Sequence, residues 1–204
     1  VYIEGITRIT AKDIAYAREM GCDIKLIGMT KNTEAGIEAY VCPMLIPAEH
    51  PLATVRGSFN AVFVHGDAVD DVMFYGRGAG ELPTASAVAG DVIDVMRNME
   101  YGCTGRIGCG CYRAVPVKQF RDVKNKFFIR MQVTNRPGVL AAIAGELGSH
   151  KVSISKVVQK VITKESAELV IVTEDVKEYH MSEALEDLKK LEPVREISSV
   201  IRSC

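Results

Sequence analysis

The chain has 204 residues, enough for one large domain or two small ones with a buried core. Its 48% hydrophobic and 25% charged residues are typical of a globular protein and exclude a disordered one. The formal net charge of −1 and the lack of a long apolar run argue against nucleic-acid and membrane partners. Six cysteines in a chain of this size do not indicate a disulfide scaffold, so we expect reduced thiols and a cytoplasmic location.

The first part of the chain is predicted to contain a short helix and two hairpins. Thr10 and Asp13 have the spacing of a capping box, and Gly21 is placed to end the helix that they open. Four runs of apolar and β-branched residues follow, and we expect them to pair as antiparallel strands. These predicted strands are residues 23–32, 37–46, 59–64 and 69–75.

Residues 74–85 form a glycine-rich turn between the last of these strands and a predicted helix over residues 84–99. We expect Pro83 in the first helical turn, with Thr84 assisting the free amides there. A strand, a glycine turn and a helix start can together contact an anion or a nucleotide. The spacing matches neither the dinucleotide fingerprint nor a Walker loop, so a purely structural turn remains the alternative. The glycines concerned are Gly76, Gly78 and Gly80.

Residues 101–125 are predicted to be a linker, because glycines interrupt the pattern and basic residues become frequent toward its end. The linker contains Cys103, Cys109 and Cys111, whose spacing is C-x5-C-x-C. This is not a standard zinc-binding spacing. We interpret the three cysteines as incidental and expect no metal site.

The second part of the chain follows the order βαββαβ, which is the ferredoxin-like arrangement. A sandwich this small leaves a sheet face or edge to be covered, so we expect pairing with a second copy. The predicted strands are residues 127–133, 152–162, 167–172 and 194–201, and the predicted helices are residues 137–148 and 182–191.

Several segments in the right order resemble the homoserine dehydrogenase family, and one segment resembles an ACT domain. The resemblance implies an α+β chain, with an antiparallel sheet and helices followed by a ferredoxin-like βαββαβ ACT domain. Residues 1–100 would be the C-terminal part of the family's catalytic and dimerisation domain, 101–125 a linker, and 126–204 the ACT domain. The matching segments are EGI (4–6), IKL (24–26), GSFNAV (57–62), GDAV (66–69), FYGRGAG (74–80) and PTASAV (83–88), and NRPGVL (135–140) for the ACT domain.

By this resemblance, the complete enzyme interconverts L-aspartate 4-semialdehyde and L-homoserine with NADP or NAD, in threonine and methionine biosynthesis. The family's catalytic lysine and its acidic partners are expected upstream of Val1, so no catalytic residue is assigned. We therefore expect this chain alone to be inactive and to bind no cofactor tightly. The residues expected to contact the cofactor in the complete enzyme are Gly76, Gly78, Ala79 and Gly80.

The ACT resemblance implies binding of an amino-acid effector, L-threonine, by a homodimer or higher homo-oligomer. Free amides at a helix start could hold its carboxylate, although capping the helix is the alternative role for Asn135. The residues expected at the effector site are Asn135, Gly138, Val139, Leu140 and, across a dimer, Ile154. The alternative function for the whole chain is a non-catalytic, dimeric amino-acid-sensing or assembly module.

Overall fold

The computed structural model describes residues 1–105, 108, 110 and 114–203. It divides the chain into two compact units, which we describe separately. The first unit combines Val1–Ala48 with Val115–Cys204, and the second is Glu49–Ala114. This division differs from the predicted boundaries, because the first 48 residues group with the second half of the chain. The predicted domain limits at residues 100 and 126 therefore stay a prediction about the complete protein.

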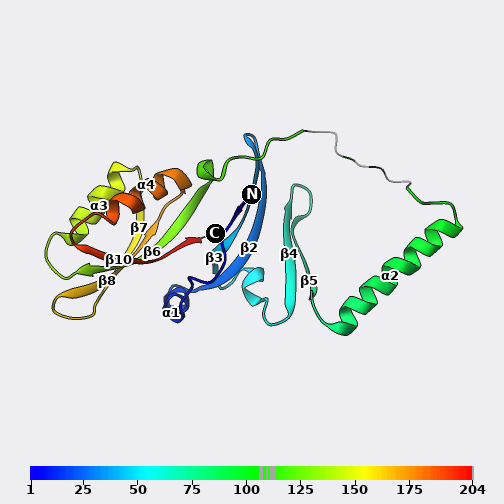
Figure 1. Cartoon of the computed structure of the whole chain (residues 1–204), viewed down its shortest axis with the longest axis horizontal. Coiled ribbons are helices and arrows are strands. Elements are labelled where there is room, and N and C mark those ends of the chain that lie inside the picture. The colour runs from blue at the N-terminus through cyan, green and yellow to red at the C-terminus, as the bar shows by residue number, and fades with distance from the viewer. Residues whose placement is uncertain (106–107, 109, 111–113, 204) are drawn as a thin grey trace. The chain divides into compact units, whose positions relative to one another are not determined.

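A single sheet runs through the first unit, as Figure 1 shows. The strand order is β1-β3-β10-β6-β8-β7, with β2 paired to β3 and β9 paired to β6. The antiparallel part β10-β6-β8-β7 has the order of a ferredoxin-like βαββαβ domain and confirms that prediction. The strands are β1 (Tyr2–Ile3), β2 (Cys22–Thr33), β3 (Gly36–Pro47), β6 (Lys124–Thr134), β7 (Ile154–Val161), β8 (Ser166–Thr173), β9 (Val176–Lys177) and β10 (Val194–Ser203).

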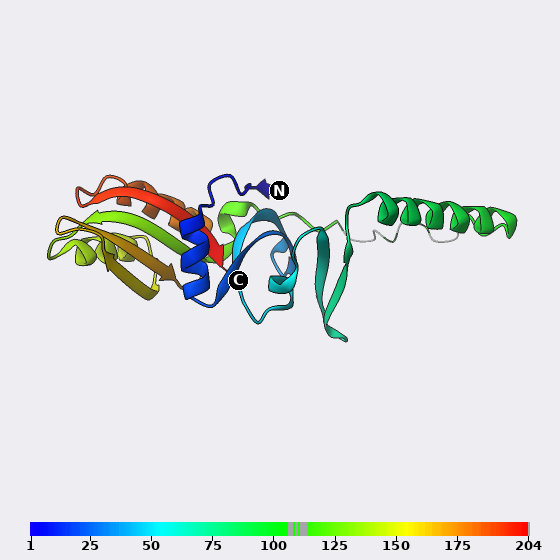
Figure 2. The same ribbon diagram turned by 90° about the horizontal axis from the view of Figure 1, so that it is seen from below.

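Helices cover both faces of this sheet. On one face α3 (Val139–Ser149) and α4 (Glu178–Leu188) pack on alternate residues of β6, beginning with Phe127 and Ile129. On the other face α1 (Ala11–Glu19) packs through Tyr16 and Ala17 against Phe128 of β6. Figure 2 shows α1, in blue, crossing the strands. We expected a second copy to cover a sheet face or edge, and α1 of the same chain partly covers the face.

The start of α1 has the predicted capping box. The Asp13 backbone N–H donates to Thr10 Oγ1 at 3.3 Å, and the Thr10 backbone N–H donates to Asp13 Oδ2 at 2.9 Å. Met20 is the C-cap, and Gly21 follows with a φ of +72°, which glycine adopts without strain. Local sequence chemistry therefore sets both ends of this helix.

A buried ion network attaches α1 to the sheet. Arg130 of β6 donates from Nε to Asp13 Oδ1 at 2.9 Å and from Nη1 to Glu168 Oε1 at 3.0 Å. Glu168, on β8, also accepts from the Tyr16 hydroxyl at 2.6 Å and forms an ion pair with Lys12 at 2.8 Å. Arg130, Asp13 and Glu168 are 4%, 0% and 2% exposed, so each charge depends on its partners instead of on water.

The long β2–β3 hairpin forms as predicted, and β3 then joins the second half of the chain. Met44 of β3 pairs in parallel with Arg202 of β10. The second part of the predicted linker is also built into this unit, because the Ile37 N–H donates to the Pro116 carbonyl at 2.9 Å and Lys118 forms an ion pair with Glu38 at 2.7 Å. The short helix η2 (Phe120–Asp122) follows. These pairings explain why residues 1–48 do not separate from the ACT segment.

The second unit consists of η1 (Pro51–Thr54), a β4–β5 hairpin and α2. β4 (Phe59–Gly66) and β5 (Asp70–Arg77) pair antiparallel as predicted, but they form a two-stranded sheet separate from that of the first unit. The helix α2 (Glu81–Glu100) begins three residues earlier than predicted, so Pro83 is its third residue and Thr84 lies inside it.

In the described part of the chain, none of the α2 side chains is buried. Its apolar stripe is exposed at Leu82, Val88, Val92, Ile93, Val95, Met96 and Met99. Among all described residues, no helix combines the length and apolar character that a membrane crossing requires.

Candidate functional site

The glycine turn at the end of β5 is shaped by its contacts with β4. Gly76 is paired with Asn60 across the hairpin, and the Gly78 N–H donates to the Ser58 carbonyl at 3.4 Å. A Cβ at Gly78 would overlap the side-chain amide of Asn60, and Gly80 has a φ of +128°. Gly80 therefore requires glycine for its backbone conformation, whereas a side chain at Gly78 would have to displace that of Asn60.

The helix start after this turn carries exposed main-chain amides. Gly80 is the N-cap of α2, and the first helical bond runs from the Thr84 N–H to the Gly80 carbonyl at 3.1 Å. Among the described residues, no side chain caps this end, which corrects the predicted role of Thr84. The turn thus presents the positive end of a 20-residue helix to solvent, beside Ala79.

Arg77 lies against the hairpin instead of projecting freely. Its Nη1 donates to Ser58 Oγ at 3.1 Å, and its guanidinium lies 4.9 Å from the centre of the Phe59 ring. That ring stacks on Tyr75, with centroids 4.8 Å apart. Sequence reasoning did not predict this arrangement, which holds the cation next to the glycine turn.

In the predicted effector turn, Asn135 has a different role from capping. Its side-chain amide donates to the Thr163 and Lys164 carbonyls at 3.5 and 3.4 Å, and its backbone N–H donates to the Glu165 carbonyl at 3.0 Å. Asn135 therefore binds the β7–β8 turn. The N-cap of α3 is Gly138, which has a left-handed φ of +87° and an exposed backbone.

The other predicted effector residues do not meet within one chain. Val139 is buried in the core below α3, whereas Leu140 is 41% exposed. Ile154 begins β7 and pairs with Thr173, at the end of the sheet opposite Asn135. The predicted residues Asn135, Gly138, Val139 and Leu140 could therefore share a site with Ile154 only if a second copy supplies Ile154, as the prediction required.

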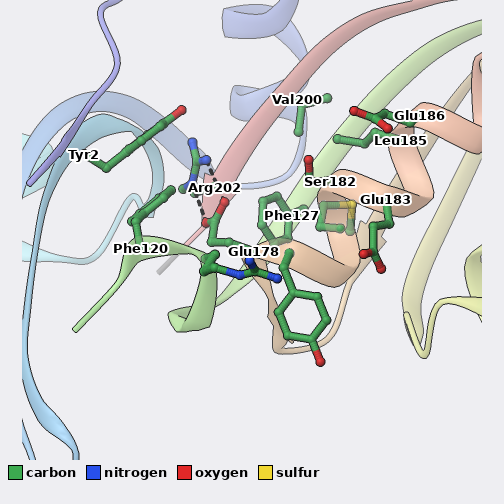
Figure 3. A pocket seen from close by; sticks show the side chains of 13 residues that line it. Tyr2, Phe120, Phe127, Glu178, Ser182, Glu183, Leu185, Glu186, Val200 and Arg202 are labelled. Carbon is green, nitrogen blue, oxygen red and sulfur yellow. Dashed lines mark hydrogen bonds and ion pairs between the residues drawn. The ribbon is translucent and has the colours of Figure 1, made fainter.

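A cavity of about 480 Å³, seen in Figure 3, opens beside α4 and β10 in the first unit. Arg202 lies at one end and donates from Nε and Nη2 to the two oxygens of Glu178, at 2.6 and 2.8 Å. Its Nη1 donates to Glu4 Oε2 at 2.6 Å. The rings of Tyr2 and Phe120 stack on each other beside the guanidinium, with centroids 4.9 and 5.0 Å from it.

Arg202 is the shared cation of two carboxylates in this cluster. Burial lowers the pKa of Arg202, but the hydrogen bonds and charge of Glu178 outweigh burial and raise it above its ordinary value. With its donors directed at Glu178 and Glu4, Arg202 joins β10 to α4 and to the segment after β1, and is poorly placed to bind an anionic ligand. The partners are up to 198 positions apart in sequence, so no local pattern could have indicated them.

Of the three linker cysteines, Cys103 is half-buried and its thiol donates to the Tyr101 carbonyl at 3.5 Å. Cys109 and Cys111 lie outside the described residues. The interpretation of the three as incidental therefore stays a prediction.

Comparison with known proteins gives two matches along the chain. Residues 1–93 match the family model described as homoserine dehydrogenase, and residues 127–193 match the ACT domain model. The chain belongs to the homoserine dehydrogenase family. Its α+β fold, with an ACT domain after the homoserine dehydrogenase segment, confirms the predicted fold class.

Relatives in this family match the whole chain but not their own whole length. The chain is 40% identical to the homoserine dehydrogenase of Mycobacterium tuberculosis over 212 residues, covering 99% of the chain and 48% of the relative. It is 39% identical to that of Bacillus subtilis, covering 99% and 47%. The chain thus spans about half the length of the curated relatives that it matches.

Solved structures of the family share the fold. The crystal structure of a homoserine dehydrogenase from Thiobacillus denitrificans is 35% identical, with a TM-score of 0.90 over 98% of this chain and 47% of that one. The Staphylococcus aureus homoserine dehydrogenase at pH 7.0 is 30% identical, with a TM-score of 0.62 over 98% and 46%. The family segment at residues 1–93 includes the glycine turn and the start of α2.

Proposed function

We propose that this chain is part of a homoserine dehydrogenase that interconverts L-aspartate 4-semialdehyde and L-homoserine with NADP or NAD. The observation that carries the proposal is the family match over residues 1–93, which places the glycine turn in a homoserine dehydrogenase segment. The nicotinamide cofactor supplies or accepts the hydride in such a reaction. This chain contributes binding surface, and we propose no proton-transfer role for any of its residues.

The glycine turn fits a cofactor contact on physical grounds. Gly76, Gly78, Ala79 and Gly80 follow one another along an exposed turn whose backbone carries little side-chain cover. The amides at the start of α2 can donate to a phosphate or to a carboxamide oxygen, and the helix dipole favours negative charge there. A side chain added at Gly76, Gly78 or Gly80 would hinder the close approach that such a contact needs.

Substitution of Gly80 tests this role in the complete protein that carries the chain. We expect Gly80→Ala to raise the KM for the nicotinamide cofactor several-fold, because the alanine disfavours the φ of +128° that orients the helix amides. Gly90→Ala is the matched control, since Gly90 lies in the same helix and a Cβ there meets open space. Equal cofactor KM values in the two variants would contradict the proposed contact.

The chain by itself provides a second test. We expect no dehydrogenase turnover from the purified 204 residues with either cofactor, measured by nicotinamide absorbance in both directions. Turnover above the buffer blank would contradict the assignment of the catalytic residues to the rest of the enzyme.

We further propose that the ACT domain binds an amino acid, L-threonine, between two copies of the chain. The exposed amides at the Gly138 N-cap suit a carboxylate, and Ile154 lies at the other sheet end, so a second copy must supply that wall. The edge strand β7 and the exposed stripe of α2 both favour association.

Thermal melting of the chain against a panel of amino acids tests the effector proposal. A saturable rise in melting temperature with L-threonine alone is expected from binding to the folded state. The absence of any shift would favour an assembly role for the ACT domain instead. Light scattering at high protein concentration should show a dimer or larger species, and a monomer would contradict the proposed site between copies.

A further inference from the structure

We propose that Glu146, His150 and Asp187 form a binding site for a divalent transition-metal ion, with Zn²⁺ the preferred ion. The site lies where α3 and α4 end, at the opposite end of α3 from the effector turn. Glu146 and His150 are one helical turn apart, with His150 at the C-cap of α3. Asp187 is the next-to-last residue of α4. This proposal departs from the expectation, drawn from the sequence, that the chain has no metal site.

The three ligand atoms converge on one point. His150 Nε2 lies 3.0 Å from Asp187 Oδ2 and 3.4 Å from Glu146 Oε1, and all three atoms lie within 4.8 Å of one another. Ligand atoms held about 2.0–2.1 Å from a tetrahedral zinc ion are about 3.3–3.4 Å apart, so the side chains need little rearrangement. A single ring N–H can point at only one of the two carboxylates, whereas a cation satisfies both of them and the nitrogen.

Groups around these ligands favour a cation. Glu183, one turn before Asp187 on α4, places Oε2 4.0 Å from His150 Nδ1. A small rotamer change would let it accept from Nδ1–H, which is the usual arrangement for a metal-bound histidine. Both helices end here, and their carbonyl ends carry partial negative charge.

The surrounding residues hold the two helix backbones in place and leave the ligands accessible to an ion from solvent. The core residues Ile143 and Leu147 of α3 and Leu188 of α4 pack together under the cluster, which fixes the two backbones. The His150 side chain is 19% exposed and that of Asp187 is 39% exposed, so an ion can enter and keep a water ligand. One imidazole and two carboxylates suit zinc and its neighbours better than magnesium, which prefers an all-oxygen octahedral shell.

Lys190 competes with the metal for Asp187. Its Nζ lies 2.6 Å from Asp187 Oδ1, on the carboxylate oxygen that does not face His150. The Lys190 side chain is 73% exposed and can move away without leaving a buried charge. Removal of this lysine should therefore strengthen metal binding.

Cobalt binding gives a direct test in the full 204-residue chain. Cys103, Cys109 and Cys111 are first changed to Ser, because thiolates in the linker would bind the same ions. We expect Co²⁺ to produce a saturable visible absorption band at one equivalent, Zn²⁺ to abolish the band, and Zn²⁺ to raise the melting temperature. The test depends neither on dehydrogenase activity nor on an amino-acid effector.

Variants in the same background decide the assignment. His150→Ala should abolish the cobalt band, and His180→Ala, on α4 with its ring against that of Tyr179, should retain it. Asp187→Asn is the second ligand variant if His150→Ala does not fold, and Lys190→Ala should lower the dissociation constant several-fold. A cobalt band that survives His150→Ala and Asp187→Asn, or no saturable band in the parent chain, would overturn the proposal.

Discussion

Replacement of Arg130 by Met is expected to destabilise the first unit strongly, because it removes the cation from the centre of the buried network. Arg130 contacts Asp13 and Glu168 at 2.9 and 3.0 Å, and both carboxylates are almost completely buried. Methionine fills part of the volume but leaves the two negative charges without their shared partner. Glu168 would keep the Tyr16 hydroxyl and Lys12, whereas Asp13 would keep only its capping bonds.

The expected magnitude follows from the burial of the charges. Removal of one partner from a buried ion pair costs about 3–5 kcal/mol of unfolding free energy, since the remaining charge is neither solvated nor paired. For a chain of this length, that corresponds to a fall of about 6–20 °C in melting temperature. An exposed ion pair contributes about 0–1 kcal/mol, so location within the fold decides the size of the effect.

The effect should depend on pH with a definite sign. Burial raises the pKa of Asp13, but hydrogen bonds from Thr10 and Arg130 outweigh it, so the pKa lies below its ordinary value. Burial likewise raises the pKa of Glu168, and its donors, led by Lys12, outweigh it. A lowered folded-state pKa contributes stability that is present at neutral pH and lost as pH falls through the acidic range.

In Arg130→Met the Asp13 carboxylate loses one of the two groups that lower its pKa. Its pKa is therefore higher in the variant than in the parent chain, and a fall in pH costs the variant less stability than it costs the parent. The stability difference between the two proteins should therefore be largest near pH 7 and should shrink toward pH 4.

Urea unfolding followed by far-UV circular dichroism measures this difference, since the chain has no tryptophan for fluorescence. Arg136→Met is the matched control, because Arg136 forms an exposed ion pair with Glu192. Adding Asp13→Asn and Glu168→Gln to Arg130→Met should recover part of the loss, since it removes the unpaired charges. A loss below about 1 kcal/mol, or one that does not shrink at acidic pH, would refute the reasoning.

Two further predictions concern single positions in the first and second units. Gly36→Ala should lower the unfolding free energy by about 2 kcal/mol or more, because Gly36 has a φ of +125° and a Cβ there would overlap the Pro116 carbonyl. Gly90→Ala should instead raise it by about 0.5–1 kcal/mol, and equal urea midpoints would contradict the steric argument. Burial raises the pKa of the Cys42 thiol to about 11, so iodoacetamide at pH 8 should leave Cys42 unmodified in the folded chain. Mass spectrometry should find the half-buried Cys103 modified before Cys42, and rapid native labelling of Cys42 would contradict its burial.

The elements that the sequence predicted correctly depend on neighbours along the chain. The Thr10–Asp13 capping box, the β2–β3 and β4–β5 hairpins and the βαββαβ order all follow from local caps, turns and periodicity. The motifs around the glycine turn and Asn135 were sufficient to recognise the family. The helix start near Pro83 was misplaced, because a glycine N-cap gives a weaker signal than a polar one.

The tertiary structure alone decided how these elements meet. The sequence predicted β6 as a strand, but only the fold shows that α3 and α4 cover the face of Phe127 and Ile129 and that α1 packs on Phe128. The pairing of β3 with β10, and the meeting of His150 with Asp187, join residues far apart in the chain. Asn135 binds the distant β7–β8 turn for the same reason. A local pattern records which face of an element is apolar or charged, whereas long-range packing selects the partner for that face.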